Sequence, residues 1–247
     1  MTSIDLSAKF AKAVEKWPFD HLVIDNFLPL EMARALADEM PDYESSVWVK
    51  YANAIEDKRT CNYWHSFPAH TYEFMSFMAS PQIVNSLSDA FGIDDLECDI
   101  GLHGGGWHMH RRGGKLNIHQ DYSIHPKLKK QRRLNFILYL SPNWQGQWGG
   151  GLQLWSHSEE KKAPKQCETT VECVFNRAII FRTDQQSWHG LPSPLICPAG
   201  VFRKSLAIYY VSPPDEGVSR RERALFSPTA EQASDKEVLK LIQERQQ

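Results

Sequence analysis

The sequence is poor in cysteine, has no long apolar run and carries no excess charge of either sign. Its five cysteines are scattered and form no CxxC pair: Cys61, Cys98, Cys167, Cys173 and Cys197. This pattern indicates reduced thiols and argues against a disulfide framework or a zinc knuckle. The net charge of -2 provides no general attraction to nucleic acid or to an anionic membrane. No apolar run reaches the roughly 18 residues needed to span a bilayer.

The first residues also lack the features of an export signal. The segment MTSID at residues 1–5 has neither a basic stretch nor an apolar one, so we expect a cytoplasmic protein. Its 247 residues, with 42% apolar and 23% charged side chains, are typical of a soluble globular protein. We find no internal repeat and no low-complexity tract. We expect a small-molecule or peptide substrate, and the oligomeric state stays open.

The pattern of apolar residues along the sequence changes near residue 96. Before this point, apolar spacing predicts one short strand over residues 21–25. It predicts helices over residues 7–14, 30–40, 71–78 and 81–91. After it, β-branched and aromatic runs alternate with glycine, proline and polar turns. These runs predict strands over residues 97–102, 116–121, 134–140, 152–155, 178–182 and 202–211.

Short strands at such spacing favour a sandwich or barrel, and a jelly roll leaves a mouth for a ligand. Near the end of the chain, Val238, Leu241 and Ile242 follow helical spacing behind a candidate cap at Asp235. We therefore predict a mainly β fold: a cupin-like jelly roll, or double-stranded β-helix, with an N-terminal helical layer and a C-terminal helix. The expected parts of this one globular domain are residues 1–95, the β-helix 96–214 and the tail 215–247.

A histidine and a carboxylate stand one residue apart in the first of the central runs, at His119 and Asp121. Side chains at i and i+2 of a strand project from the same face. With His189, the set becomes two imidazoles and one carboxylate. This is the ligand set of non-heme Fe(II) oxygenases, and it leaves coordination positions open.

Further features around these residues support a metal site. Apolar residues alternate with the candidate ligands over residues 116–121, as on a strand with one face toward a cavity. Gly190 follows His189, and a glycine beside a ligand would let the backbone approach a metal closely. Arg203 begins the next strand and could pair bidentately with the carboxylate of a small diacid.

The residues from Gly104 to Tyr210 resemble the catalytic domain of prolyl-4-hydroxylase-like Fe(II)/2-oxoglutarate-dependent dioxygenases. The resemblance extends more weakly over residues 18–212. The matching segments are Leu116-x-x-His119-x-Asp121, RLNFILYL at 133–140, GGGLQLW at 149–155, SWHG at 187–190 and RKSLAIYY at 203–210. Their order and approximate spacing agree with the family, which is far more specific than the His-x-Asp pair alone.

The resemblance implies a role for each matching position. His119, Asp121 and His189 would hold Fe(II), while Arg203 and the hydroxyl of Tyr139 would bind the far carboxylate of 2-oxoglutarate. The implied reaction splits O2: one oxygen atom enters succinate as CO2 leaves, and the other hydroxylates the substrate. Ascorbate is a further cofactor that the resemblance allows. The substrate itself, whether a peptidyl proline, an amino acid, a sugar or another metabolite, is left open.

Several alternatives accompany this interpretation. The pair His108-x-His110 could be the metal pair of a cupin, although no glutamate follows it. A non-catalytic jelly-roll binding module is a second alternative, but it would be expected to have lost a ligand or Arg203. The basic run at residues 127–133 is interpreted as a solvated loop, with substrate contact left open. Trp107 and Trp188 are candidates for the wall of the substrate cavity.

Overall fold

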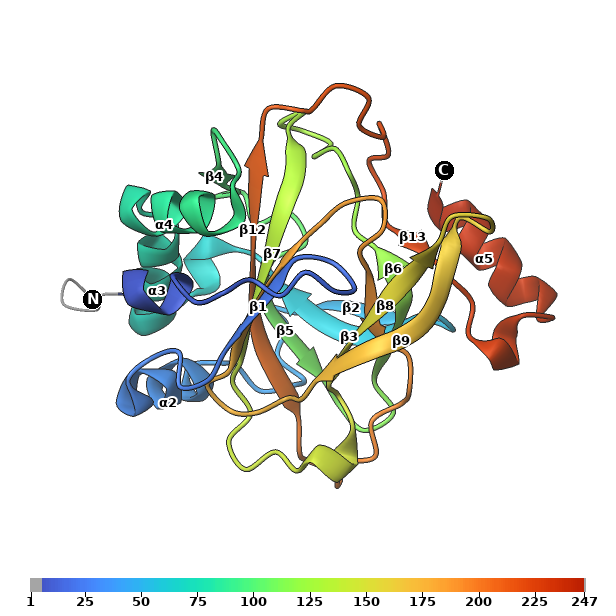
Figure 1. Cartoon of the computed structure of the whole chain (residues 1–247). Coiled ribbons are helices and arrows are strands. Elements are labelled where there is room, and N and C mark those ends of the chain that lie inside the picture. Colours follow the sequence, from blue (N-terminus) through green and yellow to red (C-terminus); the bar gives the residue numbers. More distant parts are fainter. Residues whose placement is uncertain (1–5, 247) are drawn as a thin grey trace.

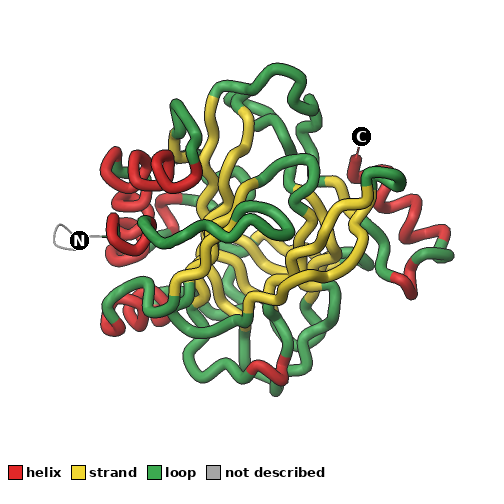
Figure 2. The backbone as a smooth tube through the Cα atoms, in the orientation of Figure 1, coloured by secondary structure: helices red, strands yellow, loops and turns green. Residues whose placement is uncertain are grey.

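A computed structural model describes residues 6–246 of the chain. The α-helices are α1 (Ser7–Phe10), α2 (Leu30–Asp38), α3 (Ala69–Met78), α4 (Pro81–Phe91) and α5 (Lys236–Gln246). The strands are β1 (His21–Ile24), β2 (Val49–Ala52), β3 (Glu56–Cys61), β4 (Glu97–Cys98), β5 (Gly106–His110), β6 (Lys115–Gln120), β7 (Gln131–Tyr139), β8 (Leu152–Ser158), β9 (Ala163–Val171), β10 (Ala178–Arg182), β11 (Trp188–Leu191), β12 (Arg203–Ser212) and β13 (Leu225–Phe226). Helices α1–α4 gather on one side of the strands and α5 lies on the other (Figures 1 and 2).

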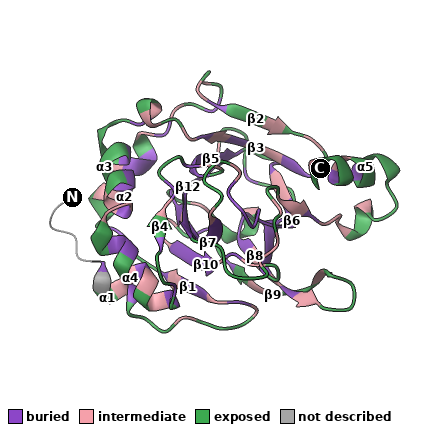
Figure 3. Cartoon of the chain, turned by 90° about the horizontal axis from the view of Figure 1, so that it is seen from above, coloured by how far each residue is buried: buried purple, intermediate pink, exposed green. Residues whose placement is uncertain are grey.

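The strands form one antiparallel sheet that curls into a nearly closed jelly roll. Its order is β1-β10-β7-β12-β5-β3-β6-β11-β8-β9, with β2 added to β3, β4 to β12 and β13 to β6. Strand β3 is the seam, because it pairs with β5 at one end and with β6 at the other. Seen from above, the strands surround an interior in which many residues are buried (Figure 3). The predicted fold class is confirmed.

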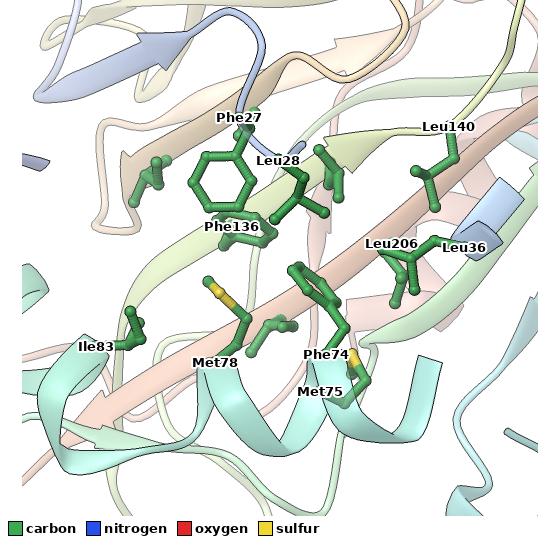
Figure 4. Packing of buried hydrophobic residues seen from close by; sticks show 14 of the residues in the cluster. Phe27, Leu28, Leu36, Phe74, Met75, Met78, Ile83, Phe136, Leu140 and Leu206 are labelled. Atoms are coloured by element: carbon green, nitrogen blue, oxygen red, sulfur yellow. The ribbon is translucent and has the colours of Figure 1, made fainter. Parts of the chain in front are cut away.

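Alternation along β7 explains why this run of sequence is apolar almost throughout. Phe136 and Leu138 point to one face and join the large core that includes residues of α2, α3 and α4 (Figure 4). Ile137 and Tyr139 point to the other face and join a smaller cluster inside the roll. A strand covered on both faces has no polar face to show, so it reads as a continuous hydrophobic run.

The helix boundaries follow ordinary capping chemistry. Pro81 occupies the first turn of α4, and Gly92 ends that helix in the left-handed region at φ 59°. The cap predicted for the C-terminal helix is confirmed, because Asp235 Oδ1 accepts hydrogen bonds from the N–H groups of Glu237 and Val238. These signals are local, which is why the sequence predicts both ends well.

Some predicted elements are shorter than expected. The helix predicted over residues 7–14 ends at Phe10, because Glu15 forms a backbone bridge with His21 and the chain between them must turn. The strand predicted over 97–102 ends at Cys98, because the Asp99 carboxylate accepts the N–H groups of Gly101 and His103 and closes a turn. Strands β2, β3, β5, β9, β11 and β13 were not predicted.

The first 95 residues contribute more than helices to the roll. Strand β1 extends one end of the sheet beside β10, and β3 closes the seam beside β5 and β6. Among residues 6–246, no helix combines the length and apolar character that crossing a membrane requires.

Candidate metal centre

The three predicted metal ligands meet at one end of two paired strands. His119 lies near the end of β6, Asp121 follows that strand, and His189 lies on β11, directly opposite His119 in the register. One ligand atom from each residue lies within 4.8 Å of the other two. All three side chains are buried. Among the described residues, this is the only group of three or more His, Cys, Asp or Glu side chains placed in this way.

Backbone carbonyl groups orient both imidazoles. His119 Nδ1 lies 3.0 Å from the carbonyl oxygen of Asn117, and His189 Nδ1 lies 2.9 Å from that of Ser187. Because a carbonyl can only accept, each Nδ1 carries the proton and each Nε2 presents its lone pair toward Asp121. Burial lowers the pKa of both histidines, that of His119 to about 3. The imidazoles are therefore neutral at pH 7, as metal ligation requires.

The carboxylate is held by two polar side chains from β7. The Arg132 guanidinium lies 3.0 Å from Asp121 Oδ1, and the Asn135 amide donates to Oδ2 over 3.3 Å. Burial alone would raise the pKa of Asp121, but the charge of Arg132, with smaller contributions from the two histidines and the Asn135 hydrogen bond, outweighs it and lowers the pKa to about 2. With two neutral imidazoles and one ionised carboxylate, the donor set fits a divalent iron ion.

Arg132 corrects the interpretation of the basic run at residues 127–133 as a solvated loop. Its side chain is buried, and its guanidinium lies 3.4 Å and 3.3 Å from the ring centres of Tyr122 and Tyr209. Such a clamp favours arginine, whose planar cation stacks on aromatic faces. The run is therefore partly structural: its last residues begin β7, and Arg132 supports a metal ligand.

A cavity of about 380 Å³ opens beside the three ligands, and Arg203 reaches into its lining from β12. Arg203 is buried, and its Nε donates to the carbonyl oxygen of Gly150 over 2.7 Å. Gly150 adopts φ +82°, and a Cβ there would lie 2.9 Å from Arg203 Cδ. The glycine triplet is thus a tight turn that makes room for this arginine.

Tyr139 and His110 both lie close to Arg203, but only His110 lines the cavity. The Tyr139 ring centre is 5.0 Å from the Arg203 Cζ, yet its hydroxyl donates to the carbonyl of Val171 over 3.4 Å, and the residue does not line the cavity. His110 is the register partner of Arg203 on β5 and does line the cavity. Its buried ring nitrogens have no hydrogen-bond partner among the described residues.

Three other expectations are revised. His108 and His110 have no third ligand near them within the described chain, so the cupin pair loses its support. Trp107 packs in the outer core and Trp188 donates to His157, and neither lines the cavity. Gly190 allows a close approach, but to the backbone of β6: a Cβ there would lie 2.7 Å from the Asn117 carbonyl oxygen.

Sequence reasoning missed three residues that shape this site, Lys58, Arg132 and Asn135, and considered His110 only as a cupin ligand. Alternation along Gly106–His110 and along Gln131–Tyr139 could have placed His110 and Asn135 on inward faces. Alternation would place Arg132 on the face opposite to Asn135, and it lines the cavity because the register of β7 against β12 shifts beside it. Lys58 gave no signal, because β3 is a charged strand, and the two strands that place it in the roll, β5 and β6, lie more than 40 residues away in the sequence.

These features agree with comparisons to known proteins. Residues 105–211 match the profile of the 2OG-Fe(II) oxygenase superfamily. No curated protein sequence gives a significant match. The fold is similar to that of a prolyl-4-hydroxylase from Pseudomonas putida, at 18% identity and a TM-score of 0.57, covering 85% of this chain and 97% of the other.

Two further solved structures share the fold. A Trichoplax adhaerens prolyl hydroxylase, solved with a hypoxia inducible factor oxygen degradation domain peptide, has 19% identity and a TM-score of 0.52, covering 78% of this chain and 83% of the other. A Phytophthora capsici prolyl 4-hydroxylase has 20% identity and a TM-score of 0.51, covering 92% of this chain and 68% of the other.

The fold and the buried His-Asp-His group define a non-heme iron oxygenase. Residues 105–211 of the chain match the 2OG-Fe(II) oxygenase superfamily, and the intact triad lies inside these matched residues. Family and triad together imply Fe(II) and 2-oxoglutarate.

Proposed function

We propose that this protein hydroxylates an aliphatic C–H bond of its substrate in a reaction that consumes O2 and 2-oxoglutarate and releases succinate and CO2. The observation that carries the proposal is the shared cavity, which places His119, Asp121 and His189 together with the buried cation Arg203. A metal triad and a fixed guanidinium are what a chelating keto diacid needs at its two ends.

His119 and His189 would hold Fe(II) through Nε2, and Asp121 through a carboxylate oxygen. When bound, the iron supplies the activation of O2 with 2-oxoglutarate as the co-reductant. Arg132 and Asn135 fix the carboxylate, so that the ligand does not rotate or take up a proton. Burial of the ligands excludes bulk water from the reacting centre.

Arg203 would bind the far carboxylate of 2-oxoglutarate. Its Nε already donates to the Gly150 carbonyl and its Nη1 to Ser205 Oγ over 3.4 Å. The terminal nitrogens carry further N–H groups for the ligand. His110 would donate a ring N–H to the same carboxylate, because it lies opposite Arg203 and its nitrogens have no partner within the described residues. Tyr139 would release its long hydrogen bond to Val171 and donate its hydroxyl as well.

The test is succinate formation from 2-oxoglutarate by the Fe(II)-loaded protein, measured with and without ascorbate and coupled to a mass-spectrometric search for substrates that gain one oxygen atom. We expect His119→Ala to abolish succinate formation, because it removes one of the three ligands. His65→Ala is the matched control, since His65 is exposed and lies outside the cavity. A loaded wild-type protein that neither binds nor decarboxylates 2-oxoglutarate would contradict the proposal.

A further inference from the structure

A second group of charges lies in the cavity beside the metal centre, and the proposed chemistry does not use it. Lys58 and Glu56 project from the inner face of the seam strand β3, with Lys58 Nζ 3.2 Å from Glu56 Oε2. Glu56 is buried, and the Lys58 side chain is only 15% exposed. Lys58 lines the same cavity as His119, Asp121 and His189. Burial lowers the pKa of its ammonium group.

The Glu56 carboxylate also pairs with a second cation. Arg245, from α5, pairs with Glu56 Oε1 and lines the cavity. The Tyr51 ring lies 5.3 Å from Lys58 Nζ and 5.9 Å from the Arg245 Cζ, and the Phe226 ring lies 6.0 Å from Arg245. Phe226 in turn stacks on His119, with 5.2 Å between ring centres. We call Tyr51, Glu56, Lys58, Phe226 and Arg245 the seam wall.

The charges lining the cavity do not balance. Five cations and three carboxylates line it: Lys58, Arg132, Arg203, Arg223 and Arg245 against Glu56, Asp121 and Glu222. The two positive charges of Fe(II) and the two negative charges of 2-oxoglutarate cancel each other. The loaded cavity thus keeps a surplus of two positive charges. An uncompensated cation in a poorly solvated site is costly, and a ligand of opposite charge removes that cost.

The cations assigned to the metal ligand and the co-substrate lie in a different part of the sequence from Lys58 and Arg245. Arg203 and Arg132 lie within residues 105–211, the segment matched to the superfamily, and each has an assigned partner. Lys58 and Arg245 lie outside that segment and share one carboxylate. These two cations therefore lie outside the part of the chain that resembles the superfamily.

We propose that the primary substrate is a small molecule bearing a carboxylate or a phosphate group, and that Lys58 and Arg245 bind this anionic group. The proposal rests on the function proposed above and names its substrate class. The C–H bond to be hydroxylated would lie between the anionic group and the metal. The cavity of about 380 Å³ must also hold 2-oxoglutarate, which favours a small molecule, since drug-sized ligands fill pockets of about 300–1,000 Å³.

Anion binding can be measured before the substrate is known. The probe is inorganic phosphate, added to protein loaded with Mn(II) and saturating 2-oxoglutarate, with paramagnetic relaxation of the ³¹P nucleus as the readout. Mn(II) accepts the same nitrogen and oxygen ligands as Fe(II) and relaxes nearby nuclei. We expect a saturable increase in relaxation, at least tenfold weaker in affinity in Lys58→Gln and unchanged in Lys50→Gln, an exposed lysine on β2. A parallel titration with ¹³C-acetate determines whether phosphate or carboxylate is preferred.

Glu56→Gln provides a test in the opposite direction. Removing the carboxylate that Lys58 and Arg245 share should tighten phosphate binding several-fold, while a purely structural cluster would lose it. Far-UV circular dichroism and 2-oxoglutarate affinity verify that each variant is folded. If relaxation is not saturable in the wild type, or is equally strong in Lys58→Gln, the anion site is refuted while the oxygenase function stands. If the wild type binds neither Mn(II) nor 2-oxoglutarate, both proposals fail.

Discussion

The wall of the cavity that carries Arg203 and the seam wall are built from different kinds of structure. Arg203, His110 and Tyr139 project from central strands of the roll, which pack against hydrophobic clusters. The seam wall combines a short strand pair, the two-residue β13 and helix α5. Its own buried hydrophobic cluster contains only Ile55, Phe226, Val238 and Ile242.

This difference suggests a division of labour between the two walls. Groups that must meet the metal and the co-substrate with fixed geometry stand on strands that cannot move without disturbing the main core. Of the residues that we assign to the substrate, Arg245 stands on α5, which packs on a small hydrophobic cluster and can loosen without unfolding the roll. Lys58 stands on β3, which closes the sheet between β5 and β6. The predictions below test whether the two walls are independent in this way.

The largest effect is expected for Arg203→Met. Loss of the charge-assisted pair with the 2-oxoglutarate carboxylate should cost about 3 kcal/mol, which is roughly a hundredfold increase in the KM for 2-oxoglutarate. Metal affinity, measured by Mn(II) titration, should stay within about twofold, because Arg203 contacts none of the three ligands. Equal losses of metal and 2-oxoglutarate binding would show that Arg203 is a structural residue.

On the seam wall, Ile242→Ala should loosen α5 while the roll stays folded. Truncating this buried side chain removes about 2 kcal/mol from a cluster of four buried residues, so amide hydrogen exchange in α5 should accelerate about 30-fold. Exchange in β7 and the KM for 2-oxoglutarate should not change. Acceleration of both regions together would mean that the two walls unfold as one unit. Leu239→Ala is a matched control, because that side chain is exposed.

The glycine turn behind Arg203 allows a finer test with a paired control. Gly149 and Gly150 both have positive φ, at +78° and +82°, so alanine strains the backbone at either site. Only at Gly150 would the new Cβ press on Arg203; at Gly149 the nearest atom is Leu195 Cδ2, 3.9 Å away. We expect Gly150→Ala to raise the KM for 2-oxoglutarate about tenfold more than Gly149→Ala does. Equal effects would show that both glycines are needed only for their backbone conformation.

The smallest effect is expected for Tyr139→Phe. Loss of one hydrogen bond to a carboxylate that Arg203 still holds should cost about 1 kcal/mol, or roughly a fivefold increase in the KM for 2-oxoglutarate. An unchanged KM would mean that the hydroxyl stays on the Val171 carbonyl and that Tyr139 only packs beside Arg203. His110→Phe separates the two donors, since it removes the ring N–H groups and leaves Tyr139 intact.

Local spacing accounts for the parts of the site that the sequence predicts correctly. His119 and Asp121 are one residue apart, so strand alternation alone places them on one face. The Asp235 cap is likewise a short-range signal. The order of His189 and Arg203 on later strands came from the family resemblance, and the register of β11 with β6 brings His189 directly opposite His119.

Only the tertiary structure could reveal the charges around these ligands. The basic run containing Arg132 has the composition of a solvated loop, and only the tertiary structure buries this residue between Tyr122 and Tyr209 and against Asp121. Arg245 meets Glu56 across 189 positions of sequence, through a helix that folds back over the seam. Periodicity encodes which face of an element is buried, but the partner of a buried charge depends on which strands pair, and that choice is made by long-range packing. The sequence by itself thus determined the candidate metal ligands and the type of fold, and the tertiary structure decided what surrounds them.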